Sequence, residues 1–204
     1  MQYLGPPFTF GINSISENMQ NFDCRTVSQS MVTIVELMIP SYANFGGKIH
    51  GGILLSLMDK VAYAAATKHS GAYCVTVSVD NVNFLQPVEV GDLVSLKAAV
   101  NYVGKSSMVV GIRVEAENVK EGIVKHTNTS YFTMVAKDEE GNLIQVPKLK
   151  LERPIEVRRY ASAITRKKKN FEFRNDYLEG KKSFMLDEQI EKLKNERCVI
   201  EMKD

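Results

Sequence analysis

The sequence contains few cysteines, and none of them lies close to another. Cys24, Cys74 and Cys198 are far apart in the chain, and no CxxC motif or Cys/His cluster is present. This pattern argues against a zinc site and against a disulfide framework. It is typical of a protein from a reducing compartment, so we expect a cytoplasmic location.

The sequence also has no long apolar segment and no excess of one charge. No apolar run approaches the roughly 20 residues of a membrane-spanning helix. The first residues, MQYLGPPFTFG, lack a basic segment followed by an apolar core, so we expect no signal peptide. With 26 Lys and Arg against 24 Asp and Glu, the net charge of +2 predicts no general attraction to nucleic acid or to a membrane.

What the chain does have is enough apolar sequence for one sizeable domain. Its 204 residues are 44% hydrophobic and 25% charged, as in ordinary globular proteins. Composition predicts an irregular N-terminal arm over 1–26, a folded domain over 27–152 and a charged helical extension over 153–204. The extension includes the basic run RKKK at 166–169. We expect it to be either a solvated appendage or an arm that packs in an oligomer.

The order of the predicted elements is a strand, a long helix and at least four strands. The segment 28–39 alternates like a strand and ends before Pro40. Helical spacing of apolar residues predicts a helix from Gly51 or Gly52 to Lys68. This order predicts an α+β fold, in which an antiparallel β-sheet wraps around one long central α-helix.

The strands after the helix are predicted from alternating apolar residues. Three faces are expected to be apolar: Val75, Val77 and Val79; Val94, Leu96, Ala98, Val100 and Tyr102; and Met108, Val110, Ile112, Val114 and Ala116. The fourth strand is the β-rich segment GIVKHTNTSYFTMVA. Gly104 and Lys105 are predicted to form a two-residue hairpin turn between the second and third strands.

The predicted helix contains an unexpected carboxylate. Asp59 follows Leu-Met and shares a helical face with residues that are mostly apolar or small. An acid at such a place can be a general base or a nucleophile. It can also be a structural residue that accepts a hydrogen bond from a backbone or hydroxyl donor. Gly51 and Gly52, where the helix begins, offer free N–H groups at its positive end, or simply form a turn.

The stretch NFGGKIHGGILLSLMD, which runs from Asn44 to Asp59, resembles the signature of hotdog-fold acyl-CoA thioesterases, with the same fifteen residues from Asn to Asp. The segments VSVDNVNFLQPVEVGD, YVGKSSMVVGIRVEAEN and HTNTSYFTMVAKDEEGNLIQVPKL resemble the cytosolic acyl-CoA hydrolases of the YciA and brain acyl-CoA hydrolase type. The resemblance covers about 28–170. It implies a hotdog fold and an enzyme that hydrolyses acyl-CoA to a free fatty acid and coenzyme A, with no metal and no cofactor beyond its substrate.

The resemblance also implies roles for particular residues. Asp59 would be the base or nucleophile, the Gly51 N–H would stabilise the oxyanion, and Asn44 would hold the attacking water or the thioester. His50 would hydrogen-bond near the thioester, although it can equally serve as a helix cap. The residues expected to bind coenzyme A are Gly52, Ser78, Gly104, Lys105, Ser106 and Ser107. The last four form the motif GKSS, which can also be an ordinary hairpin turn.

In this family the site lies at a dimer interface, with Asn44 of one chain facing Asp59 of the other. The resemblance therefore implies a homodimer, and a homohexamer built as a trimer of dimers. The alternative is a non-catalytic acyl-CoA-binding regulatory module on the same fold. A hotdog dehydratase or hydratase is less well supported, because His50 and Asp59 are nine residues apart and are not neighbours on a helix.

Overall fold

A computed structural model of the protein describes residues 24–202. The elements in chain order are β1 (Cys24–Thr26), a 3₁₀ turn (Ser28–Ser30), β2 (Val32–Leu37), a second 3₁₀ turn (Pro40–Tyr42), α1 (Gly51–Ser70), β3 (Tyr73–Val79), β4 (Asp92–Val103), β5 (Ser107–Asn118), β6 (Ile123–Lys137), β7 (Lys148–Lys150), α2 (Pro154–Lys182) and α3 (Leu186–Leu193). The chain divides into two compact units, Met1–Ala161 and Ser162–Asp204. Most of the predicted N-terminal arm, residues 1–23, lies outside the described residues, and its last three residues form β1.

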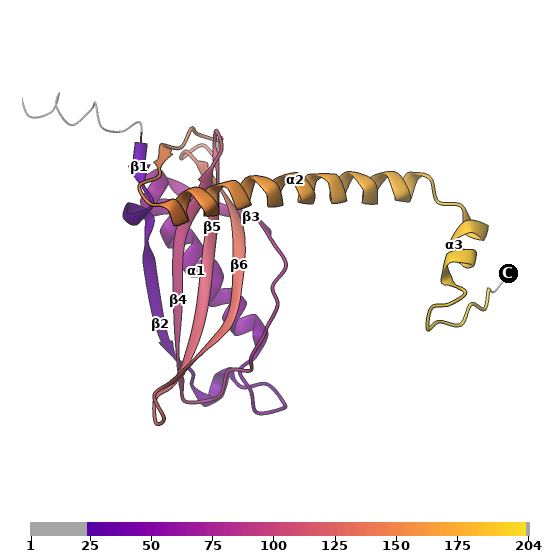
Figure 1. Cartoon of the computed structure of the whole chain (residues 1–204), viewed down its shortest axis with the longest axis horizontal. Helices are drawn as coiled ribbons and strands as arrows, with labels where there is room; N and C mark the ends of the chain where they lie inside the picture. Colours follow the sequence, from indigo (N-terminus) through magenta and orange to yellow (C-terminus); the bar gives the residue numbers. More distant parts are fainter. Residues whose placement is uncertain (1–23, 203–204) are drawn as a thin grey trace, which may run out of the picture. The chain divides into compact units, whose positions relative to one another are not determined.

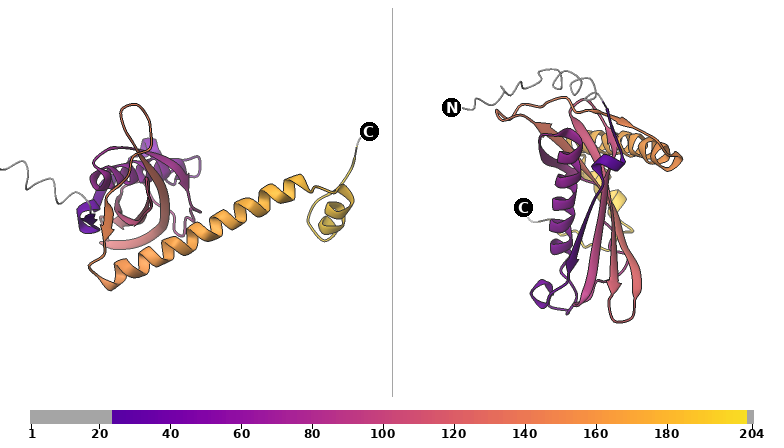
Figure 2. Two further views of the ribbon diagram at one scale, coloured as in Figure 1. Left: turned by 90° about the horizontal axis from the view of Figure 1, so that it is seen from above. Right: turned by 90° about the vertical axis from the view of Figure 1, so that its left-hand side faces the viewer.

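The first unit is built around a five-stranded antiparallel sheet. Its spatial order is β2-β4-β5-β6-β3, so β3 pairs with β6 and not with its neighbour in sequence, β4. The sheet curls around α1, as the view from above shows (Figures 1 and 2). The predicted α+β arrangement, with one central helix wrapped by an antiparallel sheet, is therefore confirmed.

Helix α1 buries one side against the concave face of the sheet. Its buried residues recur at helical spacing: Leu54, Leu57, Met58, Val61, Ala62, Ala65, Ala66 and His69. The helix ends at Gly71, whose φ of 74° is the left-handed conformation that glycine adopts most easily. The helix thus extends two residues beyond the predicted end, Lys68.

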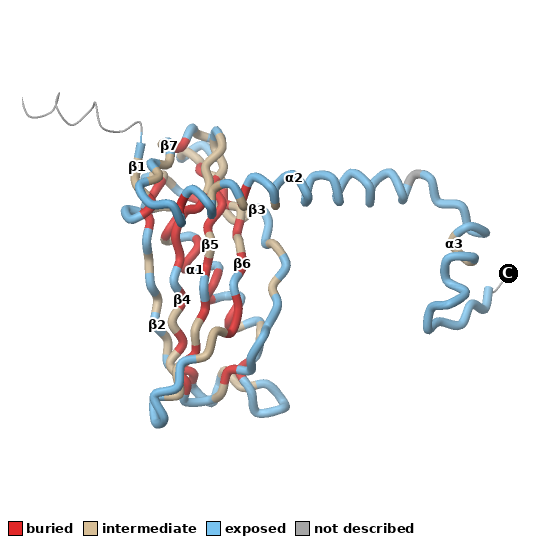
Figure 3. Tube along the Cα trace, in the orientation of Figure 1, coloured by how far each residue is buried: buried red, intermediate tan, exposed pale blue. Residues whose placement is uncertain are grey.

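The two central strands bury the faces that the alternation predicted. On β4, Val94, Leu96, Ala98 and Val100 are buried, and on β5, Met108, Val110, Ile112, Val114 and Ala116 are buried. Tyr102, the last residue of the predicted β4 face, is only half-buried, because the pairing with β5 shifts between Val100 and Tyr102. Buried segments lie on β4, β5 and α1 in Figure 3, and they belong to one core. The period-two pattern was reliable here because both strands are paired on both sides and covered by the helix.

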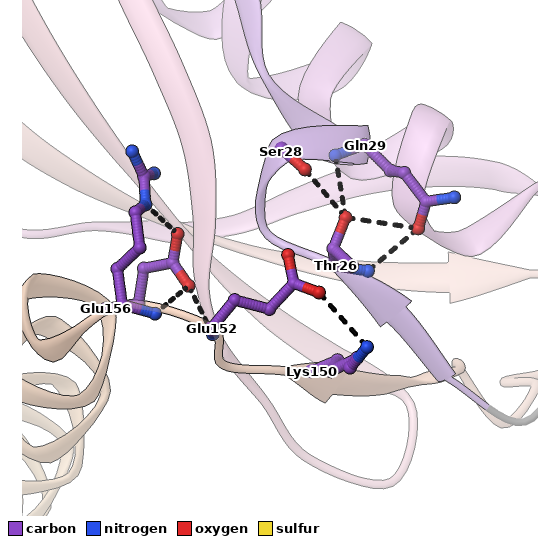
Figure 4. Close-up of polar contacts among 7 residues, drawn as sticks. Thr26, Ser28, Gln29, Lys150, Glu152 and Glu156 are labelled. Atoms are coloured by element: carbon purple, nitrogen blue, oxygen red, sulfur yellow. Dashed lines mark hydrogen bonds and ion pairs between the residues drawn. The ribbon is translucent and has the colours of Figure 1, made fainter.

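The first predicted strand, 28–39, is shorter in the structure. Ser28–Ser30 form a 3₁₀ turn before β2, because local hydrogen bonds compete with the sheet. Ser30 Oγ donates to the Val27 carbonyl at 2.7 Å, and the Thr26 N–H donates to Gln29 Oε1 at 2.8 Å. Figure 4 shows the contacts among Thr26, Ser28 and Gln29.

The hairpin between β4 and β5 also differs from the prediction. Three residues, 104–106, separate the strands, and Gly104 does not have a positive φ, so the expected two-residue turn with glycine first is wrong. Gly104 instead leaves room for a neighbouring side chain. A Cβ there would lie 2.7 Å from Ser107 Oγ, so a larger residue would require the Ser107 side chain to rotate away.

The start of α2 is held by a buried carboxylate. Glu156 Oε2 accepts from the backbone N–H groups of Glu152 and Arg153, and Glu156 Oε1 accepts from Arg153 Nε at 2.7 Å (Figure 4). Burial alone raises the pKa of Glu156, but the hydrogen bonds from Glu152 and Arg153 outweigh it and lower the pKa. Glu156 therefore acts as a capping residue for α2.

Candidate active site

Asp59 lies on α1 and contacts the neighbouring strand β3. Thr76 Oγ1 donates a hydrogen bond of 2.6 Å to Asp59 Oδ1, and the same oxygen lies 3.1 Å from Met134 Sδ. A hydroxyl has one proton, and the charged carboxylate is the stronger acceptor. Asp59 is exposed in the single chain, so the apolar surround that its sequence context suggested is wrong for one chain taken alone. The Thr76 contact fixes one carboxylate oxygen and leaves Oδ2 free to act on a ligand.

Thr76 faces the helix because it lies two residues after the buried Cys74, just before β3 becomes irregular. The pairing between β3 and β6 shifts between Thr76 and Ser78, so Val77 is an extra residue in the strand. Cys74 is buried and Thr76 is half-buried on the side of α1, whereas Val77 is 55% exposed. The predicted apolar face of Val75, Val77 and Val79 is therefore wrong, because the bulge and the open edge of β3 override simple alternation.

Ser78, a predicted coenzyme A contact, lies on this same edge strand. It is exposed and follows the bulge. β3 is the last strand of the sheet, so Ser78 does not lie on an inner strand. Ser78 lies two residues from Thr76, near the candidate site. Its contact with coenzyme A stays a prediction.

The beginning of α1 is organised by His50. Its Nδ1 accepts a hydrogen bond of 2.8 Å from the Gly52 N–H, so His50 is the N-cap of the helix. A Cβ on Gly52 would lie 2.9 Å from this nitrogen, which explains the glycine. Of the two roles that the sequence left open for His50, capping is the one the geometry supplies, and the Gly52 N–H is already used by that cap.

The adjacent Gly51 N–H is the donor available to a ligand. Within residues 24–202, no protein group accepts a hydrogen bond from it. The ring of Phe84 lies beside it, 3.3 Å from where a Gly51 Cβ would be. A larger residue would therefore have to displace the Phe84 ring by a few tenths of an ångström. The Gly51 N–H is therefore a free backbone donor at the positive end of α1, beside the ring of Phe84.

Asn44 stabilises the loop that leads to this helix. Its Oδ1 accepts from the N–H groups of Gly46 at 2.9 Å and Lys48 at 3.2 Å. This is the turn role that asparagine commonly fills. The side chain is exposed, and its Nδ2 group remains able to donate to a ligand.

One chain does not bring the candidate groups to a single point. Gly51 and Asp59 are eight residues apart on α1, which separates them by about 12 Å along the helix axis. A thioester carbonyl needs an oxyanion donor and a reacting carboxylate or its water, each about 3 Å away. The Gly51 N–H and the Asp59 carboxylate of the same chain are therefore too far apart to serve one carbonyl.

The GKSS motif lies at the opposite end of α1 from Gly51. The Lys105 carbonyl accepts from the Val146 N–H, and the next residue's carbonyl, Pro147 O, lies 2.9 Å from Nε2 of His69 in the last turn of α1. From Asp59 to that end of the helix is about 16 Å. Lys105 is exposed, and Ser106 and Ser107 are half-buried.

Two residues of this site were missed from the sequence, Thr76 and Phe84. A threonine in an alternating strand looks like any other strand residue, and its contact with Asp59 depends on how β3 packs against α1, which the sequence does not mark. Phe84 lies in the irregular segment between β3 and β4, which carries no periodic signal. The one available signal was that an acid on α1 requires a donor on the strand packed against it.

Among the residues that the structure describes, no group of three or more His, Cys, Asp or Glu side chains is placed to hold a metal ion. In the same residues no helix has the length and apolar character needed to cross a membrane.

Comparison with known proteins identifies the family of this chain. A model of the thioesterase superfamily matches residues 46–123. Protein VdlD of Helicobacter pylori is 42% identical over 156 residues, which cover 76% of this chain and 89% of that protein.

Solved structures show the same fold. The acyl-CoA hydrolase of Staphylococcus aureus, in complex with butyryl coenzyme A, is 31% identical with a TM-score of 0.71, over 78% of this chain and 97% of that one. A hexameric acyl-CoA thioesterase is 34% identical with a TM-score of 0.73, over 74% of this chain and 97% of that one.

The Staphylococcus aureus enzyme also offers a comparison of spacing. Its structures include alanine variants of an asparagine, an aspartate and a threonine, in which the aspartate follows the asparagine by 15 residues and precedes the threonine by 17. The same two separations join Asn44 to Asp59 and Asp59 to Thr76 in this chain.

Proposed function

Because the chain belongs to the thioesterase superfamily, as a hotdog-fold acyl-CoA thioester hydrolase, we propose that it cleaves acyl-CoA to a free fatty acid and coenzyme A with Asp59 as the reacting carboxylate. The observation that carries this proposal is the hydrogen bond from Thr76 to Asp59, which holds a carboxylate ready at the surface of α1. The spacing shared with the three substituted residues of the Staphylococcus aureus enzyme supports it.

Each group has a chemical task. The thioester carbonyl oxygen becomes negative as the carbonyl carbon is attacked, and the Gly51 N–H stabilises that charge with the help of the helix dipole. Asp59 either removes a proton from the attacking water or attacks the carbonyl carbon itself. Asn44 donates from Nδ2 to the water or the thioester. Thr76 orients the Asp59 carboxylate by holding Oδ1.

In this proposal the active site is formed by two chains. The separation of about 12 Å between Gly51 and Asp59 within one chain supports this, because a second chain can bring the two groups to one carbonyl. The β3 edge has unpaired backbone groups and exposed apolar side chains, among them Tyr73 and Val77. Edge-to-edge pairing of two β3 strands places Asn44 and Gly51 of one chain opposite Asp59 and Thr76 of its partner. A trimer of such dimers gives the homohexamer.

Complementation between two inactive variants tests both the residues and the shared site. Asn44→Ala and Asp59→Ala are each expected to lose most thiol release from acyl-CoA. Asp59→Ala should keep its thermal stability, whereas Asn44→Ala should melt at a slightly lower temperature because its side chain holds the loop before α1. In a mixed dimer, one site has both wild-type residues and the other has neither. Co-expressed variants should therefore recover about a quarter of the wild-type rate, since half of the dimers are mixed and each of these has one intact site.

Two results would contradict the proposal. Full activity of Asp59→Ala would remove Asp59 from the chemistry, and no recovery in co-expressed chains would place Asn44 and Asp59 in the same chain's site. Tight binding of acyl-CoA without any thiol release by the wild-type protein would favour the alternative, a non-catalytic acyl-CoA-binding module. A chain-length series of acyl-CoAs measures the acyl preference in the same assay.

A further inference from the structure

The second compact unit carries a row of apolar side chains that its own chain leaves open. On α2, Ile164, Phe171 and Leu178 follow each other at intervals of seven residues, and they are 50%, 65% and 45% exposed. Seven residues are almost two helical turns, so these side chains lie along one line of the helix. Such a narrow row is typical of a surface that packs against another helix.

A basic row runs beside this apolar row. Three residues after each apolar residue comes a basic one: Lys167 after Ile164, Arg174 after Phe171 and Lys181 after Leu178. Over its whole length α2 has nine basic and four acidic residues. The helix therefore presents an apolar line bordered by positive charge, which we call the α2 stripe (Ile164, Lys167, Phe171, Arg174, Leu178 and Lys181).

The last helix of the chain has the complementary character. In α3, Leu186, Ile190 and Leu193 share one face, and Leu186 and Leu193 are 46% and 41% exposed. Asp187 and Glu191 lie one turn apart beside that face. Leu186 and Leu193 are seven positions apart, which is also the interval between neighbouring apolar residues of the α2 stripe. In shape and in charge, α3 fits one segment of that stripe.

The chain's own α3 is poorly placed to cover the stripe. Only residues 183–185 connect the two helices, so a folded-back α3 of eight residues, about 12 Å long, reaches the last turns of α2 and leaves Ile164 and Phe171 open. An anionic membrane is a less suitable occupant. The stripe is one residue wide, and α3 would bring Asp187, Glu188 and Glu191 toward the same negative surface.

We propose that α3 of one copy of this chain docks on the α2 stripe of a second copy. Leu186 and Leu193 pack between neighbouring apolar residues of the stripe, and Asp187 and Glu191 face its basic row. The exchange is reciprocal, since each copy offers one α2 stripe and one α3. Charge complementarity selects this pairing, because two α2 stripes facing each other would bring their basic rows together.

Two full-length charge-reversal variants test the proposal. The first, Asp187→Lys/Glu191→Lys, changes α3, and the second, Lys167→Glu/Arg174→Glu, changes α2. A carbodiimide joins carboxylates to nearby lysines, and mass spectrometry identifies the linked peptides. The wild-type protein should give links between α2 and α3 peptides. Each variant alone should lose these links at least about tenfold, because like charges then meet. A matched control, Glu196→Lys/Glu201→Lys, makes the same charge change beyond α3 and should leave the links unchanged.

Co-expression of the two variants shows whether the contact joins different copies. In that mixture the native α2 sequence and the native α3 sequence occur only on different chains. A link between a native α2 peptide and a native α3 peptide therefore proves docking between copies, and we expect it to reappear.

Three outcomes would overturn the proposal. The first is the absence of α2–α3 links in the wild-type protein. The second is a wild-type link that does not return in the mixture, which would mean that α3 folds back on its own α2. The third is binding to phosphatidylserine vesicles that depends on Lys167 and Arg174 but not on α3, which would make a membrane the occupant. Thiol release by every variant reports that its first unit is folded.

Discussion

Thr76 offers a direct test of how the Asp59 carboxylate is held. Thr76→Val removes the hydroxyl but keeps the shape, so Asp59 loses the partner that fixes Oδ1. We expect kcat to fall roughly 10- to 100-fold with a small change in KM, since orientation of the base matters most in the transition state. Thr76→Ser, which restores the donor, should recover most of the rate. Equal rates for the Val and Ser variants would show that the hydroxyl has no part in catalysis.

His69 makes stability depend on pH. The residue is fully buried, its Nε2 donates to the Pro147 carbonyl at 2.9 Å, and its Nδ1 has no protein partner. Burial lowers the pKa of His69, and the charge of Arg25 lowers it further, although the Pro147 carbonyl opposes this. Protonation would place a second, unpaired N–H donor in the core.

The sign of the pH effect follows from this lowered pKa. Above pH of about 6.5, His69 is neutral in the folded and the unfolded chain and makes no difference. As pH falls below that value, the unfolded chain binds the proton more readily, and the free energy of unfolding decreases. Thermal melts at pH 7.5 and 5.5 should therefore show a larger loss of Tm for the wild-type protein than for His69→Gln. An equal loss in both would exclude His69 as the cause.

For individual residues, the sequence predicted only part of the candidate site. It identified Asp59, because an acid among apolar residues is visible in a string of letters. It left two roles open for His50. Whether His50 caps the helix depends on the direction in which the Gly52 N–H points, and the sequence does not show this. It missed Thr76, which becomes a partner of Asp59 only through the contact between β3 and α1.

Among the elements, the beginning of α1 is held by a single side-chain cap. His50→Ala removes the acceptor for the Gly52 N–H. We expect a loss of about 1 kcal/mol and a decrease in Tm of roughly 2–4 °C. Asn is a good N-cap residue, so His50→Asn should keep the wild-type Tm. If His50→Asn is as stable as the wild type but hydrolyses acyl-CoA much more slowly, His50 has a catalytic role beyond capping.

The buried faces of the strands were predicted best where a strand is paired on both sides. β4 and β5 have neighbours on both sides and a helix over one face, so burial alternates with a period of two over 92–98 and 110–116, although 98–101 and 108–110 are buried on both faces. β3 has an open edge and an extra residue, and its valines are partly exposed as a result. The order of strands in the sheet was also out of reach, because the pairing of β3 with β6 depends on contacts between distant residues.

For the whole molecule, the position of Lys105 predicts how coenzyme A is held. Its hairpin lies about 16 Å from Asp59 of the same chain along α1, at the end of the helix away from Gly51. In the dimer that we propose, Asp59 and Lys105 of one chain then hold opposite ends of the substrate, whose thioester lies at the partner's Gly51 N–H.

Lys105→Ala should raise KM for acyl-CoA roughly tenfold, with kcat nearly unchanged, because a contact with a phosphate is the same in the ground and transition states. An acyl-pantetheine substrate, which lacks the nucleotide, serves as the control and should show no such difference between the variant and the wild-type protein. A similar rise in KM for both substrates would contradict a contact with the nucleotide.

The extra residue in β3 has a consequence for how the chain can change in length. Val77 bulges out of the pairing with β6, and the residues before and after it keep separate registers. Replacing Val77 by another exposed side chain leaves both registers intact. Deleting it makes Thr76 and Ser78 adjacent opposite Met134 and Thr133, which are already adjacent in β6, so every other pair of the ladder is kept. The strand then alternates without a break, and Thr76 still faces α1 and can reach Asp59. The fold of the hydrolase is therefore expected to tolerate the deletion, with the loss confined to the contact that Val77 makes at the edge of the proposed dimer.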